Sequence, residues 1–180
     1  MLEGLNQPTE TLAWGVLLHD VAKPPTFEKT DRIRFNGHAE LGAKMATQIL
    51  GRLRYPTHTI ETVRDLVAQH MKFMEVRRMK ESTKKRFLRQ PIFPELLELH
   101  RHDSQSSHGK MEAHDFCKAE LERLPPEALR PIRLLTGSDL IEMGIHEGPK
   151  IGQILRQIED AQLEGTITSE AEARALITTD

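Results

Sequence analysis

Five residues of this sequence are of the types that bind divalent cations and support hydrolysis: His19, Asp20, His38, His70 and Asp103. Imidazole nitrogens and carboxylate oxygens together suit a divalent cation, and one carboxylate can bridge two cations while imidazoles complete each shell. Mixed sites of this kind accept Mn, Fe, Ni, Mg or Zn with little selectivity. We therefore expect one or two divalent ions and predict no particular metal.

The chemistry that such a site favours is hydrolysis of a phosphate ester. A bound divalent cation generates hydroxide from water near neutral pH and withdraws charge from a phosphoryl oxygen. Asp20 is the predicted catalytic carboxylate, and Lys23 follows it closely enough to assist. Lys23, Arg32 and Arg34 are the predicted substrate-binding residues, because cations stabilise the negative charge that a phosphate gains in the transition state.

The alternative interpretation of these histidines is structural. Histidines within helical stripes are often packed core residues with satisfied hydrogen bonds, and a single His-Asp pair is common by chance. The sequence has nine histidines, and five are assigned to the surface or to structure: His58, His102, His108, His114 and His146. His100 and His108 are reserve ligands. The combination of five suitable residues favours a metal site over isolated core histidines.

Helical patterns surround each of these residues, so the predicted fold class is all-α. The expected helices cover residues 9–22, 38–52, 58–76, the segment PELLELHRHDSQ and residues 111–124. Pro24 and Pro25 end the first helix, and the segment that follows, through Gly37, is expected to be a loop. The sequence contains no convincing strand.

Composition indicates one domain with a tail. The chain has 180 residues, of which 38% are hydrophobic, and it carries 25 basic against 27 acidic residues, so its net charge does not indicate a nucleic-acid-coating protein. Pro125 and Pro126 mark the expected boundary between a domain at 1–124 and a helical tail at 125–180. A single cysteine, Cys117, and no apolar run of membrane-spanning length indicate a soluble, cytoplasmic protein.

Four segments of the chain resemble the HD domain of bacterial CCA-adding enzymes and related poly(A) polymerase-like tRNA nucleotidyltransferases: LLHDVAKPPTF, FNGHAELGAKMATQIL, LVAQHM and LHRHDSQSSHG. A later segment, LTGSDLIEMGIHEGPKIGQILRQIEDAQLEGTI, is similar to the helical segment that follows that domain. The resemblance implies an HD-domain helical bundle with a short C-terminal helical module. It also implies metal ligation by His19 and Asp20, a second-metal role for His38 and His70, and a closing carboxylate from Asp103.

Two departures from the family pattern change the expected activity. Nothing here matches the Gly-rich loop and paired aspartates of the nucleotidyltransferase head, so CCA addition is not expected. HD proteins also usually bring a histidine from an upstream helix, whereas MLEGL resembles the interior of that helix, as in an excised or internally initiated fragment. Water, Glu3 or a histidine of another subunit would fill the gap. A shortened helix would expose Leu5, Leu12 and Trp14, which favours a homodimer.

The resemblance implies a metal-dependent phosphohydrolase that acts on nucleotide-like substrates. Phosphodiesters such as 2′,3′-cyclic nucleotides and simple monoesters are the first expectation, with promiscuous action on synthetic di- and triesters. The alternative is a catalytically silent RNA- or tRNA-binding fragment of a CCA-adding enzyme. The basic stretch Lys72–Arg89 would then contact the RNA backbone, although a solvated helix face explains the same charges.

Overall fold

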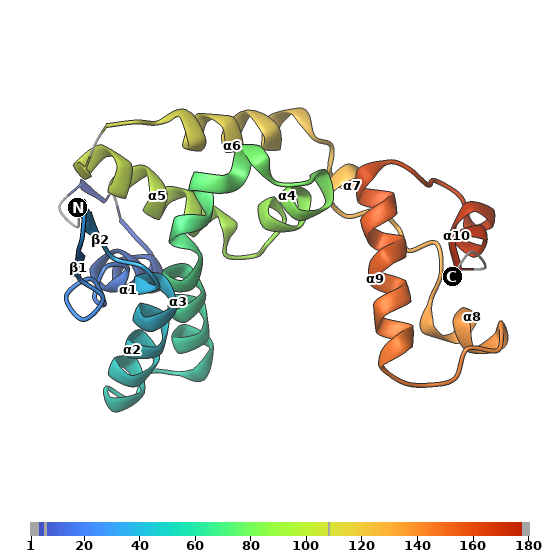
Figure 1. The fold of residues 1–180 in the computed structure, drawn as a ribbon, viewed down its shortest axis with the longest axis horizontal. Coiled ribbons are helices and arrows are strands. Elements are labelled where there is room, and N and C mark those ends of the chain that lie inside the picture. The colour runs from blue at the N-terminus through green and yellow to red at the C-terminus, as the bar shows by residue number, and fades with distance from the viewer. Residues whose placement is uncertain (1–3, 6, 108, 178–180) are drawn as a thin grey trace. The chain divides into compact units, whose positions relative to one another are not determined.

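The computed structural model describes residues 4–5, 7–107 and 109–177, and the regular structure of these residues is helical apart from one short hairpin (Figure 1). The predicted all-α fold class is confirmed. The elements in chain order are α1 Glu10–Leu18, β1 Glu28–Lys29, β2 Ile33–Arg34, α2 His38–Arg52, α3 Thr57–Gln69, the 3₁₀ helix η2 His70–Arg78, α4 Glu81–Leu88, α5 Phe93–Ser107, α6 Glu112–Arg123, α7 Pro126–Leu129, α8 Gly137–Glu142, α9 Pro149–Glu164 and α10 Glu170–Ile177.

The chain packs as two compact units that are interleaved in sequence. Residues 1–77 and 91–118 form the first unit, and residues 78–90 and 119–180 form the second. Helix α4 therefore belongs to the same unit as the C-terminal helices, and α6 passes from the first unit into the second. The predicted division into a domain at 1–124 and a tail at 125–180 stays a prediction.

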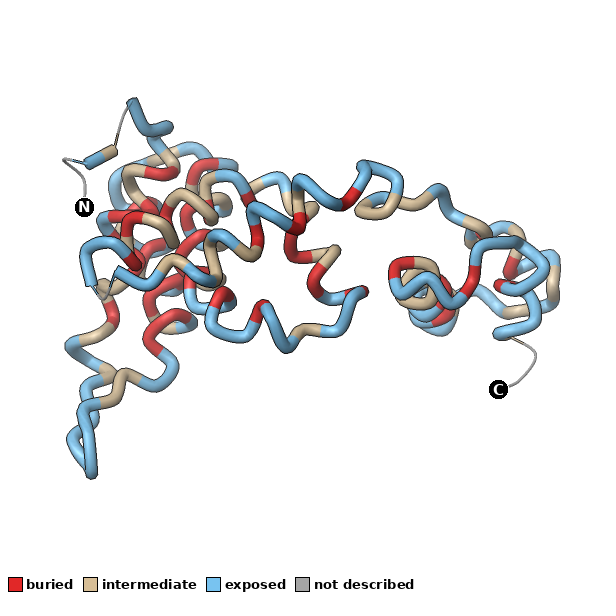
Figure 2. Tube along the Cα trace, turned by 90° about the horizontal axis from the view of Figure 1, so that it is seen from above, coloured by how far each residue is buried: buried red, intermediate tan, exposed pale blue. Residues whose placement is uncertain are grey.

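The first unit is built on the helical pair α2 and α3, which run side by side, with α1 packed against α3 and α5 (Figure 1). Small and branched apolar side chains of these helices form a dry core, consisting of Leu18, Ala43, Ala46, Leu50, Val63 and Val67. Buried positions recur along the same helices in the burial-coloured trace (Figure 2). Burial of such side chains contributes about 1.5–3 kcal/mol each for the larger ones, and this packing holds the ends of α1, α2 and α3 together.

Two glycines allow the close approach of these helices. A Cβ atom on Gly15 would lie 3.0 Å from Leu66 and 3.2 Å from Leu99, and a Cβ atom on Gly42 would lie 3.1 Å from Val67. The Gly42 position would also lie 3.7 Å from the backbone oxygen of His19. Glycine in α2 thus lets that helix pack against the turn that follows α1, where the His-Asp pair lies.

The structure corrects the prediction that the chain has no strand. The segment expected to be a loop contains an antiparallel hairpin in which Glu28 pairs with Arg34 and Lys29 with Ile33. Each strand has only two residues, which is too short to display the period-two alternation that identifies strands in a sequence.

Two predicted helices also end earlier than expected. Helix α1 stops at Leu18, and the residues that follow it form turns. The expected helix at 58–76 is α-helical only to Gln69, and from His70 it continues as the 3₁₀ helix η2. Both changes occur at a candidate ligand, so the ligands lie where regular α-helix ends.

The apolar surface expected near the N-terminus is largely covered. Leu12 is buried, and Trp14 is half-buried with its ring against that of Tyr55 at a centroid separation of 5.5 Å. Leu5 is also half-buried. The prediction of an exposed patch is therefore wrong at Leu12. The homodimer was predicted from that patch, so the structure gives it no support.

The second unit has its own core and a set of ion pairs. Its buried apolar side chains are Leu135, Leu140, Ile154, Ile158, Ile167 and Ala173. Lys84 of α4 and Glu120 of α6 are both buried, with 2.8 Å between Nζ and Oε2. Arg86 of α4 contacts Glu159 and Asp160 of α9. None of the helices formed by the described residues is both long and apolar enough to cross a membrane.

Candidate metal centre

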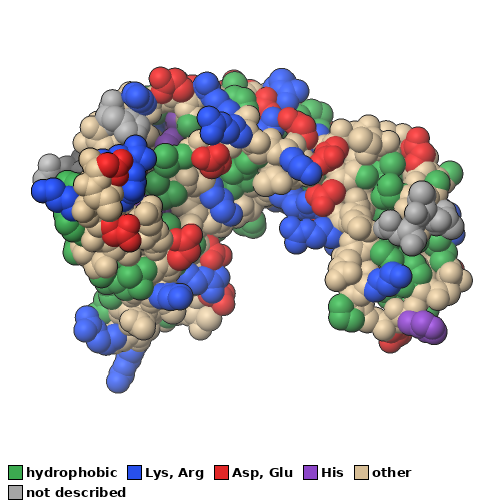
Figure 3. Space-filling view, viewed as in Figure 1, with side chains coloured by type: hydrophobic (Ala, Val, Ile, Leu, Met, Phe, Trp, Pro, Cys, Tyr) green, Lys and Arg blue, Asp and Glu red, His purple; other side chains and the backbone are tan. Residues whose placement is uncertain are grey.

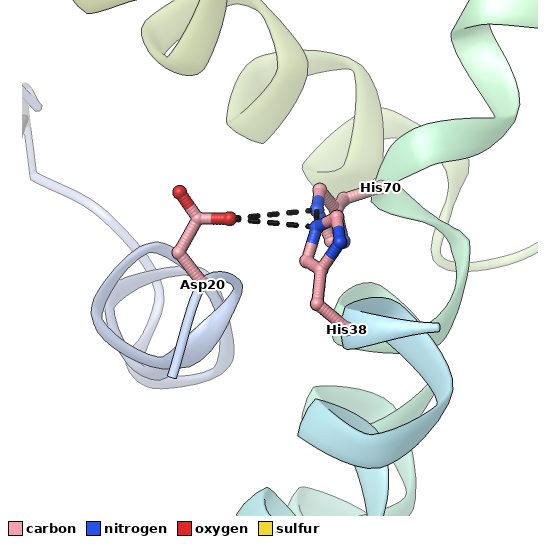
Figure 4. A group of neighbouring side chains, drawn as sticks. All are labelled: Asp20, His38 and His70. Carbon is pink, nitrogen blue, oxygen red and sulfur yellow. Dashed lines mark hydrogen bonds and ion pairs between the residues drawn. The ribbon is translucent and has the colours of Figure 1, made fainter. Parts of the chain in front are cut away.

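The five predicted ligands come from four elements of the first unit and converge at one end of its helices. His19 caps the C-terminus of α1, and Asp20 follows it in the turn. His38 is the first residue of α2, His70 is the junction of α3 and η2, and Asp103 lies in the last two turns of α5. The three histidines are buried, and the two aspartates are partly exposed. Figure 4 shows Asp20 facing His38 and His70 across the site.

Each histidine is oriented by the same local hydrogen bond. The Nδ1 atom lies 2.9 Å from the Val16 oxygen in His19, 2.8 Å from the Phe35 oxygen in His38, and 2.7 Å from the Val67 oxygen in His70. A carbonyl oxygen only accepts, so in each ring Nδ1 carries the proton and donates. In the neutral ring this leaves the lone pair on Nε2, which is the tautomer that a metal ligand requires.

The Asp20 carboxylate is shared between two groups of ligand atoms. Its Oδ1 atom lies 3.6 Å from His38 Nε2 and 3.9 Å from His70 Nε2. Its Oδ2 atom lies 3.2 Å from His19 Nε2, which in turn is 3.6 Å from Asp103 Oδ1. Two three-residue groups therefore result, one of Asp20, His38 and His70, the other of His19, Asp20 and Asp103. These residues would hold one or two divalent cations, with Asp20 as the ligand residue that both groups share.

Two observations indicate that these ligand atoms suit a divalent cation. The His38 and His70 Nε2 atoms are 3.1 Å apart although neither neutral ring has a proton there, so a cation or an added proton must separate the two lone pairs. Two nitrogens bound to one ion at about 2.1 Å are themselves about 3.0–3.4 Å apart. His19 Nε2 is also buried, and the oxygens of Asp20 and Asp103 that face it at 3.2 and 3.6 Å form no hydrogen bond of good geometry with it.

Charge and burial act in opposite directions on these groups. Burial alone would lower the pKa of His19, but the carboxylates of Asp103 and Asp20 raise it to about 9. Burial lowers the pKa of His70 to about 4, and the neighbouring His19 and His38 add to this effect. Burial would raise the pKa of Asp20, yet His19 and Lys23 hold that pKa well below its usual range. Asp20 is thus ionised, and a cation and a proton compete for His19 Nε2.

The predicted substrate-binding residues differ in their placement. Lys23 Nζ lies 2.7 Å from Asp20 Oδ2, and its side chain remains 40% exposed. Arg34 lies in β2, where it is paired with Asp31 at 2.7 Å. Arg32 is exposed in the connection between β1 and β2. Only Lys23 of these three directly contacts a ligand residue in the described interactions, and the roles of both arginines stay predictions.

The reserve ligands and the remaining histidines have other surroundings. The His100 ring stacks on Phe73 with centroids 4.1 Å apart, and His108 lies outside the described residues. His102, assigned to structure, is buried with its Nε2 atom 3.0 Å from Glu98. Glu3, one candidate for the missing upstream ligand, also lies outside the described residues.

Two residues that the sequence analysis did not single out reach this region. The Phe35 carbonyl orients His38, and the Phe35 ring lies 5.6 Å from Lys23 Nζ. Phe27 packs against Phe35 at a centroid separation of 6.0 Å. The available signal was a polar segment with a phenylalanine at each end, FEKTDRIRF, which is what a short hairpin closed by a cross-strand aromatic pair looks like in a sequence.

Comparison with known families decides the assignment. The HD domain family matches residues 1–130. This chain belongs to the HD domain family. The HD match includes all five predicted ligands, and the resemblance to tRNA nucleotidyltransferases extends beyond it into the C-terminal helices.

Two relatives are tRNA nucleotidyltransferases. The chain is 33% identical to the A-adding tRNA nucleotidyltransferase of Deinococcus radiodurans over 182 aligned positions, which include 92% of this chain and 41% of that protein. It is 35% identical to the CC-adding tRNA nucleotidyltransferase of Thermus thermophilus over 167 positions, with 89% and 38% covered. The HD chain therefore spans about two fifths of the length of these relatives. No solved structure matches it.

Proposed function

We propose that this HD protein is a metal-dependent phosphohydrolase whose reaction centre is the Asp20 carboxylate. The observation that carries the proposal is the division of Asp20 between two ligand groups, with Oδ1 toward His38 and His70 and Oδ2 toward His19. HD domains form a superfamily of metal-dependent phosphohydrolases, and the donor atoms here suit one or two divalent ions. The identity of the metal is left open.

The three histidines and Lys23 would have different roles in hydrolysis. A divalent cation, when bound, supplies an activated water and polarises a phosphoryl oxygen. Because a backbone carbonyl fixes Nδ1 in each ring, the neutral imidazoles present their Nε2 lone pairs to the site. At His19 a cation must first displace the proton that the raised pKa retains. Lys23, held 2.7 Å from Asp20 with its ammonium group partly exposed, would bind a non-bridging oxygen and stabilise the transition-state charge.

The proposed substrates are phosphodiesters such as 2′,3′-cyclic nucleotides, followed by phosphate monoesters. Support comes from the relatives, whose names describe the transfer of nucleotides to tRNA. A site with five ligand residues at a partly exposed edge also favours promiscuous turnover of synthetic di- and triesters. A cytoplasmic location and a homodimer stay predictions.

The test is metal-dependent turnover by the whole chain. The purified protein is stripped with a chelator, resupplied with Mn, Ni, Mg, Fe or Zn in turn, and assayed on bis(p-nitrophenyl) phosphate beside Asp20→Asn. We expect at least one metal to restore turnover in the wild type and none to restore it in the variant. Equal rates for the two proteins with every metal would overturn the proposal.

The second candidate function is RNA binding without catalysis. The tRNA-acting relatives favour it. However, several basic side chains of the stretch 72–89 already form ion pairs with carboxylates of this chain. Lys84 pairs with Glu81 and Glu120, and Arg86 and Arg89 pair with carboxylates of α9. Cations and carboxylates are interspersed on the face in Figure 3. Binding of a tRNA acceptor stem with steep salt dependence, without turnover under any metal, would favour this candidate.

A further inference from the structure

The hairpin beside the candidate metal centre exposes aromatic surface to solvent. Phe27 is 50% exposed, and its ring packs against that of Phe35 with centroids 6.0 Å apart and planes tilted by 57°. Ile33 of the same hairpin is 55% exposed. Phe35 is half-buried, so the exposed apolar surface of the hairpin lies mainly on Phe27 and Ile33. Apolar surface left open beside a candidate site is typical of a ligand-binding region.

The strand register places these side chains on one face. Glu28 pairs with Arg34, and side chains alternate between the faces of a strand pair, so Glu28 and Arg34 lie on the opposite face. Extending the ladder by one step puts Phe27 opposite Phe35, in agreement with their ring contact. The resulting aromatic face consists of Phe27, Lys29, Ile33 and Phe35.

The aromatic face is continuous with the ligand cluster through Lys23. Lys23 Nζ lies 2.7 Å from Asp20 Oδ2 and 5.6 Å from the centroid of the Phe35 ring. The Phe35 backbone oxygen accepts the hydrogen bond from His38 Nδ1. The same ammonium group thus borders both the carboxylate of the reaction centre and the aromatic rings, so a phosphate bound at Lys23 has the aromatic face as its neighbour.

We propose that Phe27 and Phe35 form a stacking platform for the nucleobase of a nucleoside phosphate substrate. The proposal rests on the proposed function and narrows its substrate class to phosphate esters that carry a base. Flat aromatic rings stack on any base, whereas the cations beside them attract the phosphate. Proteins that bind single-stranded nucleic acid without sequence preference combine rings and cations in the same way. A sugar phosphate without a base would bind Lys23 through its phosphate, but Phe27 would add nothing to its affinity.

The test compares two ligands that differ only by the base. AMP and ribose 5-phosphate are titrated into the whole chain with Mn²⁺ by calorimetry, and free phosphate is assayed afterwards so that hydrolysis is not mistaken for binding. We expect the wild type to bind AMP at least about tenfold more tightly than ribose 5-phosphate. Phe27→Leu should bring the two affinities to within about twofold of each other, whereas Phe27→Tyr, which keeps the ring, should preserve the preference.

A matched control comes from the far end of α2. Leu53 is also 50% exposed, and it follows a helix of 15 residues that begins at His38, about 22 Å away at 1.5 Å per residue. Leu53→Ala should leave the preference for AMP unchanged, and circular dichroism should show all three variants folded.

Three outcomes would overturn the platform: equal affinity of the wild type for both ligands, no measurable binding of AMP, or an unchanged preference in Phe27→Leu. Turnover is measured separately on methyl p-nitrophenyl phosphate, which has no base. Turnover without a preference for AMP overturns the platform alone, and a preference for AMP without turnover under any metal overturns the proposed hydrolysis alone.

Discussion

The Nε2 atoms of His38 and His70 lie 3.1 Å apart, while the Nδ1 atom of each ring is bound to a backbone carbonyl of its own segment. Each neutral ring therefore directs a lone pair at the other. This arrangement is repulsive until a cation lies between the rings, so the pair should contribute strongly to metal affinity.

Removing one ring of this pair should weaken metal binding. We expect His70→Gln to lower the affinity for Mn²⁺ by at least about tenfold, since the amide cannot reproduce the fixed imidazole nitrogen. Calorimetric titration of the chelator-stripped protein measures the change. His58→Gln, which alters an exposed histidine of the same unit, should leave the affinity unaltered, and an equal loss in both variants would contradict the assignment.

Lys23 should act on turnover more than on metal content. Replacing it by methionine removes the ammonium group beside Asp20 and keeps much of the side-chain volume. We expect kcat/KM for a phosphodiester to fall about tenfold to hundredfold, with metal content by elemental analysis near that of the wild type. If metal is lost instead and the rate per bound metal is unchanged, Lys23 serves only to position Asp20.

Gly37 and Gly51 should respond to alanine in opposite directions. Gly37 caps the N-terminus of α2 with φ of 75°, a conformation that costs a residue with a Cβ about 1 kcal/mol or more. Gly51 lies within α2, and a Cβ there would meet nothing within 4 Å. Urea unfolding should show Gly37→Ala destabilised by about 1 kcal/mol and Gly51→Ala stabilised by about 0.5–1 kcal/mol. Shifts of the same sign would contradict these backbone assignments.

Glu120 should make the second unit sensitive to acid. Its hydrogen bonds to Arg123 and the charge of Lys84 outweigh burial and lower its pKa from 4.5 to about 2. A lowered carboxyl pKa stabilises the fold above the unfolded-state value, so this stabilisation is present above pH 4.5 and is lost as pH falls toward 2.

Substituting Glu120 should remove that sensitivity. Glu120→Gln is expected to destabilise the protein at pH 7 by about 1–3 kcal/mol, because it leaves the buried Lys84 with a weaker set of partners. The difference from the wild type should shrink between pH 4.5 and 2 in denaturation curves followed by circular dichroism. Glu122→Gln, an exposed change on the same helix, serves as the control and should cost less than about 0.5 kcal/mol.

The sequence predicted those parts of the fold whose signals are local. Helix α2 has the bounds 38–52 that the sequence predicted, and the helical character of the chain followed from repeated apolar stripes. The membership of α4 in the second unit was not predictable, because it depends on contacts of Arg86 and Lys84 with residues 36 to 74 positions away. Two-residue strands likewise carry too little pattern to be recognised.

The sequence indicated which side chains would be the candidate ligands but not how they are arranged, and their binding of metal stays a prediction. Resemblance to a family indicated the five ligand residues, and the structure brings them into two groups that share Asp20. Which carboxylate oxygen faces which imidazole depends on the turn at His19 and on the change from α3 to η2 at His70, and neither ending was visible in the apolar pattern. The platform residue Phe27 was not predicted, because the hairpin that positions it has strands too short to be recognised in the sequence.

The Nδ1 bonds of the three ligand histidines depend on backbone conformation and not on the identity of a neighbouring side chain. In every case the acceptor is the backbone oxygen of the third residue upstream, so the side chain at that position does not affect the bond. Replacing Val16, Phe35 or Val67 would therefore leave the tautomer of the neighbouring ligand unchanged, even where the change weakens the core at Val67 or the platform at Phe35. Loss of packing and loss of the ligand orientation are thus separable in this chain, so a variant can be less stable and still keep its three donor nitrogens correctly oriented.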